Sequence, residues 1–182
     1  MDDEVIDSNT VSAYPDIFNR LFITENQPPF SSGIRSSVRV KQADKRHFAD
    51  PSLACSLLKA TPASLLNDLE RLGFLFEALC ERDLRINAEP FGANLYRYQD
   101  YKNQKIDAVV ELPDGNWCAI EIKLGANQIG AAAANLLEIK KQLEDDPKGK
   151  PPAALCDLCG MANAAYQRPD GVFVVPIKAL KD

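Results

Sequence analysis

The stretch that decides the fold is IDAVVELPDGNWCAIEIK, residues 106–123. Two apolar runs flank the sequence LPDGN at residues 112–116, and x-P-D-G-x is the signature of a type I turn followed by a left-handed glycine. A hairpin loop of this length pairs residue 112 with residue 116. The stretch therefore predicts two antiparallel strands whose register is fixed by the turn.

The predicted register gives the hairpin two chemically different faces. One face is continuous and apolar, with pairs formed by Val110 and Cys118, Ala108 and Ile120, and Ile106 and Ile122. The same count places Asp107 opposite Glu121 on the other face, with Cβ atoms about 5 Å apart. Lys123 lies on that face too, roughly 7 Å further along its strand. Like charges facing each other destabilise a strand pair, so we expect a cation to offset the repulsion.

Two interpretations of these charges are open. A divalent metal such as Mg²⁺ binds carboxylate oxygens and keeps several waters, which suits hydrolysis of a phosphate ester. Lys123 would then hold the attacking water or neutralise charge in the transition state. The alternative is a solvated sheet face that carries an ordinary cross-strand salt bridge.

The composition is that of a soluble globular protein with one domain of ordinary size, or one domain plus a small appendage. The chain has 182 residues, of which 46% are hydrophobic and 26% charged, and its formal net charge is -5. An acidic surface is not built as a whole to attract phosphate backbones or anionic lipid, so any nucleic-acid contact must be local. No apolar run reaches the roughly 18 residues of a membrane span. The acidic start MDDEVIDSN does not resemble a signal peptide, so we expect a cytoplasmic protein without a membrane partner.

Helical and strand periodicities predict an α/β fold from residue 61 onward. Thr61 is the expected N-cap of a long helix with Pro62 at its first position. We expect its core face to contain Leu65, Leu66, Leu69, Leu72, Phe76 and Leu79. A three-strand antiparallel meander follows, then a helix, a strand and a final strand, giving a mixed sheet flanked by helices. The predicted strands are 94–100, 105–112, 117–124, 153–159 and 171–177, with a polar loop at 161–170 and a helix at 127–145.

Shorter elements are predicted before residue 61. A helix spans residues 10–23 with Thr10 as its cap, and a Pro-, Ser- and Gly-rich connector follows at 25–37. Short extended pieces are expected at 38–40 and 45–50, and a short helix at 51–60. One face of the 127–145 helix is apolar through Ile129, Ala132, Leu136, Ile139 and Leu143.

The five cysteines are expected to be reduced thiols of a cytosolic protein. Cys156 and Cys159 form a C-x-x-C, but a four-ligand zinc site would need distant partners because His47 is the only histidine. Buried small hydrophobes in a strand are the competing interpretation of this pair.

The acidic and lysine positions of the hairpin resemble a known nuclease signature. Asp107 followed by Glu121-Ile122-Lys123 is similar to the D...(D/E)-x-K motif of the restriction-endonuclease-like, or PD-(D/E)xK, superfamily. The resemblance implies an Mg²⁺ or Mn²⁺ ion held by Asp107, Glu121 and the backbone carbonyl of Ile122. It also implies an auxiliary acid from the preceding helix, which Glu77 resembles, and a role for Lys123 in placing water or stabilising the pentacovalent phosphate.

A narrower resemblance covers most of the chain. The segments KRHFADPSLACSLL, LLNDLERLGFLFEALCERDLR, YRYQDYKNQKIDAVVEL and WCAIEIKLG resemble the C-terminal domain-of-unknown-function family of prokaryotic AAA+-type ATPases, with a nuclease-like core. Residues 1–50 would be a helix and connector, the remnant of a winged-helix-like segment, and residues 51–182 the nuclease-like domain. The implied partner is an ATPase domain or chain. No P-loop motif occurs in the sequence, so we expect either a fragment or a shortened stand-alone form.

Several residues have both a functional and an ordinary interpretation. Glu77 is either the auxiliary acid or a helix-surface carboxylate, and Gln128 is either functional or a helix-start residue. Lys105 stands where that family often has an acid. A basic group and three tyrosines could contact nucleic acid or form a solvated face beside strand aromatics. These are Arg35, Arg39, Lys41, Lys45, Arg46, His47, Tyr96, Tyr98 and Tyr101.

Two function classes follow from the sequence. One is a metal-dependent nuclease or nuclease-derived DNA-binding domain with the residues above in its site. The other is a catalytically inactive interaction or regulatory module of an ATPase system that retains the fold. Fold resemblance cannot choose between them, because one scaffold supports many functions.

Overall fold

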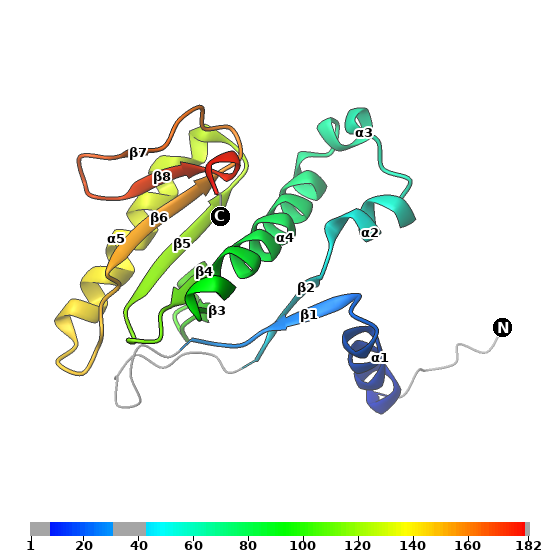
Figure 1. The fold of residues 1–182 in the computed structure, drawn as a ribbon, viewed down its shortest axis with the longest axis horizontal. Coiled ribbons are helices and arrows are strands. Elements are labelled where there is room, and N and C mark those ends of the chain that lie inside the picture. The colour runs from blue at the N-terminus through cyan, green and yellow to red at the C-terminus, as the bar shows by residue number, and fades with distance from the viewer. Residues whose placement is uncertain (1–7, 31–42, 181–182) are drawn as a thin grey trace.

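A six-stranded mixed sheet built from residues 94–176 has helices on both faces (Figure 1). The computed structural model describes residues 8–30 and 43–180. In spatial order the strands are β3 (Asn94–Gln99), β4 (Lys105–Glu111), β5 (Trp117–Lys123), β6 (Ala154–Cys159), β8 (Phe173–Pro176) and β7 (Tyr166–Gln167). β3, β4 and β5 form an antiparallel meander, and β5, β6 and β8 run parallel. The predicted α/β class, with a mixed sheet flanked by helices and an antiparallel meander followed by a crossover helix, is therefore confirmed.

The β4–β5 hairpin has the predicted turn and register. The Leu112 N–H donates to the Asn116 carbonyl at 2.8 Å, and Gly115 has φ +77°, which favours glycine. Val110 pairs with Cys118 and Ala108 with Ile120, as the count from the turn predicted. The turn chemistry therefore fixes which side chains face each helix layer.

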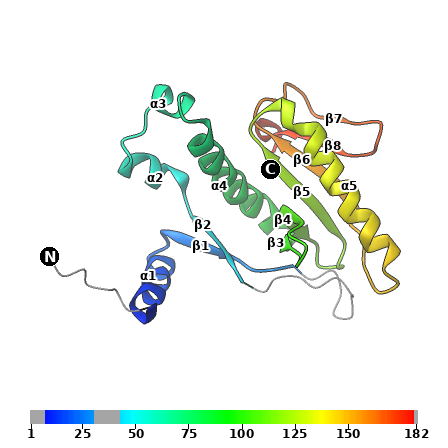
Figure 2. The same cartoon turned by 180° about the vertical axis from the view of Figure 1, so that it is seen from behind.

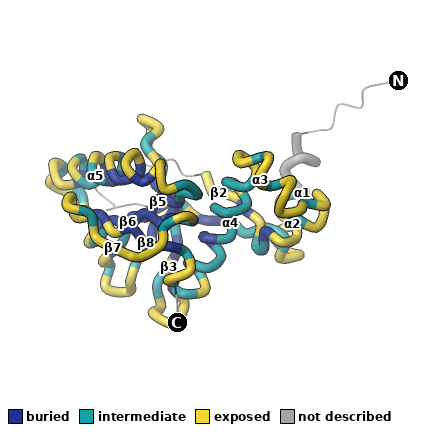
Figure 3. The backbone as a smooth tube through the Cα atoms, turned by 90° about the horizontal axis from the view of Figure 1, so that it is seen from above, coloured by how far each residue is buried: buried dark blue, intermediate teal, exposed yellow. Residues whose placement is uncertain are grey.

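The two sheet faces pack against two different helices. Helix α5 (Ile129–Asp145) is the crossover from β5 to β6 and covers one face, as seen from behind in Figure 2. Its predicted apolar side, Ile129, Ala132, Leu136, Ile139 and Leu143, is buried. The opposite face packs against helix α4 (Leu69–Ala88) through Cys80 and Leu84. Figure 3 shows the buried sheet between exposed outer surfaces.

A bulge in β4 moves one predicted residue to the other face. Tyr96 pairs with Val109, but Tyr98 pairs with Ile106, so β4 contains one extra residue between these pairs. Ile106 consequently packs in the cluster under α5 with Tyr98 and Val109 rather than with Ala108. The prediction of one continuous apolar face was wrong at Ile106, because the sequence alone does not reveal the bulge.

The long helix expected from Pro62 is divided into two helices. Thr61 caps α3 (Pro62–Leu66) in a capping box with Ser64, and Asp68 then caps α4 by accepting from the Arg71 N–H. The predicted core face was wrong in its first part, since Leu66 and Leu69 are 62% and 60% exposed. The buried residues of α4 come later and are Ala78, Cys80, Glu81, Leu84 and Ala88.

The N-terminal part contains a helix and a small two-stranded sheet. Helix α1 (Ser8–Arg20) begins before the cap predicted at Thr10, and β1 (Thr24–Gln27) pairs with β2 (Lys45–Phe48). The connector prediction for 25–37 therefore missed β1. Phe30 is 3% exposed and packs on Trp117, with ring centroids 4.7 Å apart. The extended piece predicted at 38–40 lies outside the described residues.

The remaining elements are short. Helix α2 (Pro51–Leu57) is capped by Asp50 and ends before the predicted residue 60. The described residues also contain the 3-10 turns η1 (Glu89–Phe91), η2 (Ala126–Gln128) and η3 (Ile177–Ala179). The loop at 161–170 contains the short strand β7, which was not predicted. Among the described residues no helix is long and apolar enough to cross a membrane.

The cysteines are free thiols, and the C-x-x-C lies in β6. Cys156 packs with the α4-side cluster, whereas Cys159 packs against Ile129 of α5. Because the two side chains point to opposite faces of the sheet, they cannot bind one zinc ion together. The interpretation as buried small hydrophobes fits this arrangement.

Candidate functional site

The two acids and the lysine of the hairpin meet at one point. The Lys123 ammonium lies 2.7 Å from Asp107 Oδ2 and 2.5 Å from Glu121 Oε2. These contacts join the start of β4 to the end of β5, on the edge of the sheet away from the turn. The sequence prediction that the three side chains lie together is confirmed, and a positive charge does lie between the two carboxylates.

Asp107 is held at the place where the regular β4–β5 pairing stops. The pairs run from Glu111–Trp117 to Ala108–Ile120, and the next interaction is from the Ile122 N–H to Asp107 Oδ2 at 3.0 Å. The Asp107 carboxylate thus accepts the hydrogen bond that a backbone carbonyl of β4 would accept in a regular strand pair. Because the N–H and C=O of a strand residue point to the same side of the strand, the Ile122 carbonyl is directed toward β4 as well.

The two carboxylates have different proton affinities although both are buried. Asp107 is 7% exposed and Glu121 is 4% exposed. Burial, followed by the nearby Asp107 charge, raises the pKa of Glu121 to about 7. Burial also opposes ionisation of Asp107, but Lys123 and the Ile122 N–H outweigh it and hold the pKa of Asp107 below its usual value. Pairs of acids with separated pKa values are typical of functional sites.

Asn135 of α5 positions Glu121 and was not anticipated from the sequence. Its Nδ2 donates to Glu121 Oε1 at 2.8 Å and to the Lys105 carbonyl at 2.8 Å. The amide therefore ties the crossover helix to both strands of the site. The only local signal is a polar residue on an otherwise alanine-rich and apolar helix segment.

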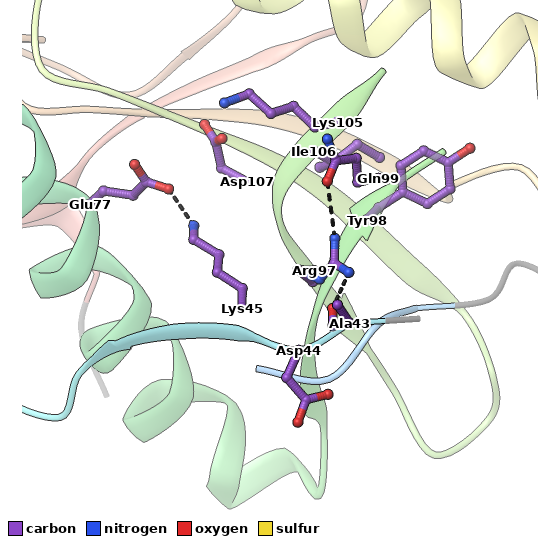
Figure 4. A pocket seen from close by; sticks show the side chains of 10 residues that line it. All are labelled: Ala43, Asp44, Lys45, Glu77, Arg97, Tyr98, Gln99, Lys105, Ile106 and Asp107. Atoms are coloured by element: carbon purple, nitrogen blue, oxygen red, sulfur yellow. Dashed lines mark hydrogen bonds and ion pairs between the residues drawn. The ribbon is translucent and has the colours of Figure 1, made fainter. Parts of the chain in front are cut away.

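A second pair of acids on α4 shares another lysine. Glu77 and Glu81 both bind the Lys45 ammonium of β2, and the Lys45–Glu81 contact is 2.5 Å. Figure 4 shows Lys45 and Glu77 pointing toward one another at the pocket that also contains Asp107. Glu81 is fully buried, and burial raises its pKa to about 7. The sequence prediction selected Glu77 and missed Glu81, the more deeply buried of the two.

Two pockets adjoin these acids. One has a volume of about 380 Å³ and is lined by Lys45, Glu77, Lys105 and Asp107 among others. The second, of about 550 Å³, lies between α4 and the end of β5 and is lined by Glu77, Ile122, Lys123 and Gln128 among others. Glu77 lines both, together with Asp107 in the first pocket and with Lys123 in the second.

The other predicted contacts have mixed outcomes. Gln128 accepts from the Gly125 N–H at the start of the helix, which is the helix-start role. Tyr98 is 2% exposed and the partly buried Tyr96 packs against the same core cluster, which favours the interpretation of these two as ordinary strand aromatics. His47 is buried beside Glu81 and is not exposed at the protein surface. Within the basic group, Arg35, Arg39 and Lys41 lie outside the described residues.

As arranged here, the acids are bridged by lysines rather than clustered for a metal. In the described part of the chain, no group of three or more His, Cys, Asp or Glu side chains is positioned to hold a metal ion. Each ammonium nevertheless occupies a position between two carboxylates, which is where oxygen ligands accommodate a hard cation. The donor set therefore fits Mg²⁺ or Mn²⁺ in type.

Comparison with known protein families identifies a family for this chain but no known activity. The model of a domain of unknown function, DUF4143, matches residues 72–180, more than half of the chain. The chain belongs to the DUF4143 family. Members of this family are commonly found in AAA-type ATPase proteins. A second domain of unknown function, DUF8612, matches residues 2–64. No curated protein and no solved structure matches the chain.

The DUF4143 match contains all the acids of the site and Lys123, but not Lys45. It includes Glu77, Asp107, Glu121 and Lys123, and thus both acidic pairs. Lys45 lies in the segment that matches DUF8612. The site of the DUF4143 segment is therefore completed by a cationic side chain from the preceding part of the chain.

Proposed function

We propose that the DUF4143 segment is a PD-(D/E)xK nuclease-like domain that binds a divalent metal and hydrolyses, or at least binds, a nucleic-acid phosphodiester. The observation that carries the proposal is the convergence of the Asp107 and Glu121 carboxylates on one cation at the open end of the β4–β5 ladder. The element order of helix, three-strand meander, crossover helix and strand supports the restriction-endonuclease-like arrangement.

Asp107, Glu121 and the Ile122 carbonyl are the proposed metal ligands, with Glu77 as the auxiliary acid. Bound Mg²⁺ or Mn²⁺ would act as a Lewis acid and lower the pKa of its water. Asp107 is suited to hold a cation because its low pKa keeps it ionised. Asn135 keeps Glu121 in a fixed orientation by donating to one of its oxygens.

Lys123 is the proposed positioning and charge-stabilising group. Its two carboxylate contacts raise its pKa, so it stays cationic at neutral pH. With the carboxylates bound to a metal, the Lys123 ammonium would be free to orient water or to face the developing charge on phosphorus. Lys105, which lines the same pocket as Asp107, adds a positive charge for a phosphate backbone.

One observation favours a second candidate, the inactive interaction module of an ATPase system. Large apolar side chains are exposed on the N-terminal elements, which is unusual unless another protein surface covers them. They include Ile17, Phe18, Leu21, Phe22, Leu57, Leu58 and Leu66. In this candidate the buried lysine–carboxylate pairs are structural and bind no metal.

Metal binding and cleavage separate the two candidates. Mn²⁺ binding is measured by electron paramagnetic resonance, and cleavage of labelled single-stranded and duplex DNA is measured with Mg²⁺ or Mn²⁺. We expect saturable Mn²⁺ binding in the wild type, loss of at least tenfold in affinity in Asp107→Asn, and cleavage reduced at least 100-fold in Lys123→Met. Glu144→Gln, a change in an exposed ion pair on α5, is the matched control and should behave as wild type.

Either of two results would overturn the proposal. The first is a wild-type chain that binds no Mn²⁺ at millimolar concentrations. The second is Mn²⁺ binding that is equally strong in Asp107→Asn, which would place the ion elsewhere. Metal binding without cleavage, together with metal-dependent DNA binding, would support the DNA-binding form of the proposal.

A further inference from the structure

A third acid on the sheet is adjacent to the hairpin site. Asp157 of β6 pairs in register with Glu121 of β5 in the parallel ladder. Residues paired in register on neighbouring strands point to the same face of the sheet. Glu121 contacts Asn135 of α5, and Leu155, two residues before Asp157, packs in the cluster under α5. Asp157 and Glu121 therefore lie side by side on the α5 face.

Asp157 is unusual because it is buried without a hydrogen-bond partner. It is 0% exposed, and neither Oδ1 nor Oδ2 has a hydrogen bond. Buried polar groups are almost always paired, and a carboxylate without a partner costs several kcal/mol when ionised. Its electrostatic neighbours are Lys123 and Asp107, which belong to the site, and Arg168, which does not. A carboxylate in this position is explained if its oxygens bind a ligand.

We propose that Asp157 is the third carboxylate ligand of the divalent cation that Asp107 and Glu121 bind. The inference rests on the proposed function and changes its ligand set, because it assigns to a β6 residue the part given to Glu77 of α4. Three carboxylates from three adjacent strands offer hard oxygen ligands of the kind that Mg²⁺ and Mn²⁺ prefer. In the described structure they are not clustered for a metal, so the cation would have to displace the Lys123 ammonium and draw the three carboxylates together.

Glu77 is less suited to the same position. It is already bound to Lys45, and its side chain is 28% exposed. It comes from α4, which packs on the opposite face of the sheet from Asn135 and Leu155. By contrast, Asp157 needs no ion pair to be broken before it can bind a cation.

The test compares the Mn²⁺ affinity of Asp157→Asn and Glu77→Gln with that of the wild type. Both substitutions replace a carboxylate by an amide of nearly the same shape. We expect the dissociation constant for Mn²⁺ to rise at least tenfold in Asp157→Asn and less than threefold in Glu77→Gln. Melting temperatures in EDTA show whether each variant folds, and Asp157→Ser is the second variant if Asp157→Asn does not. The wild-type gain in melting temperature with Mn²⁺ should also be reduced by the Asp157 variant.

The outcomes separate this inference from the proposed function. If Asp107→Asn abolishes Mn²⁺ binding but folded Asp157→Asn binds as wild type does, Asp157 is not a ligand and only this inference fails. If Glu77→Gln loses affinity and Asp157→Asn does not, the helix acid is the third ligand. A wild-type chain that binds no Mn²⁺ overturns both proposals.

Discussion

Two pairs of carboxylates in this molecule share the same chemistry but are assembled differently. Asp107 and Glu121 share Lys123 within one hairpin, whereas Glu77 and Glu81 share Lys45, which lies more than 30 residues away in the chain. The hairpin pair is fixed by turn chemistry and register. The α4 pair depends on how the β1–β2 sheet docks on a helix. The first arrangement was predictable from spacing, and the second was not.

The comparison also shows that burial alone does not distinguish the two pairs. Glu81 and Glu121 are both buried, and burial raises the pKa of each to about 7. Only Asp107 combines burial with a backbone donor and a depressed pKa. The hairpin pair therefore contains one firmly ionised carboxylate beside one that accepts a proton near neutral pH.

The largest expected effect is a difference in how much the two pairs of carboxylates contribute to the free energy of unfolding. Asp107→Ala should lower the free energy of unfolding by about 3–5 kcal/mol, because Lys123 loses a buried partner and the Ile122 N–H loses its acceptor. Glu77→Ala should cost about 1 kcal/mol or less, because its side chain is partly exposed and Lys45 keeps Glu81. Urea denaturation in EDTA gives both values.

Asp107→Asn is the control for that comparison. It keeps an oxygen that accepts from the Ile122 N–H, so its loss should be smaller than that of Asp107→Ala. Equal losses for Asp107→Ala and Glu77→Ala would show that the backbone contact adds nothing to the hairpin pair.

The pH dependence of stability is expected to be the next largest effect. A carboxyl whose pKa is higher in the folded state binds more protons when folded, so it lowers stability as the pH rises from its unfolded to its folded value. For Glu81 and Glu121 this window runs from 4.5 to about 7. Each group contributes a slope of at most about 1.4 kcal/mol per pH unit. Asp107 acts in the opposite direction, since its stabilisation is lost when the pH falls below the usual value of 3.8.

Denaturation curves at several pH values measure this effect. Glu81→Gln and Glu121→Gln should each flatten the decline of stability between pH 4.5 and 7, whereas Glu144→Gln should not. If Glu121→Gln leaves the slope unchanged, Glu121 is ionised in the folded protein well below neutral pH, which would contradict the effect assigned to its burial.

The smallest expected effects concern one glycine in the turn of the β4–β5 hairpin and one in α4. Gly115→Ala should lower the free energy of unfolding by roughly 1–2 kcal/mol, because its φ of +77° sets the hairpin register and disfavours a side chain. Gly73→Ala should raise it by about 0.5–1 kcal/mol, because the residue lies in α4 with nothing within 4 Å of a new Cβ. Thermal or urea unfolding of both variants should give opposite signs. A loss in Gly73→Ala would indicate that this helix segment is more crowded than its contacts show.

Much of the sheet and half of the site were predictable because they depend on local rules. Proline, aspartate and glycine in the turn fixed the β4–β5 register, and alternation then placed Asp107, Glu121 and Lys123 together. The bulge that moved Ile106 was not predictable, because it depends on how β3 pairs with β4. The break at Asp68 was readable in principle, since an aspartate can cap a new helix, but the leucines around it suggested a single continuous helix.

The sequence by itself determined the α/β class, the hairpin register set by the turn and the meeting of two acids with one lysine, because each follows from interactions between residues close in the chain. Only the tertiary structure decided that Lys45 binds Glu77 and Glu81, that Asn135 orients Glu121, and that Asp157 lies buried beside it. Those contacts arise from the docking of a small sheet, a crossover helix and a parallel strand. Docking depends on the shape and packing of whole surfaces, which no short spacing of residues encodes.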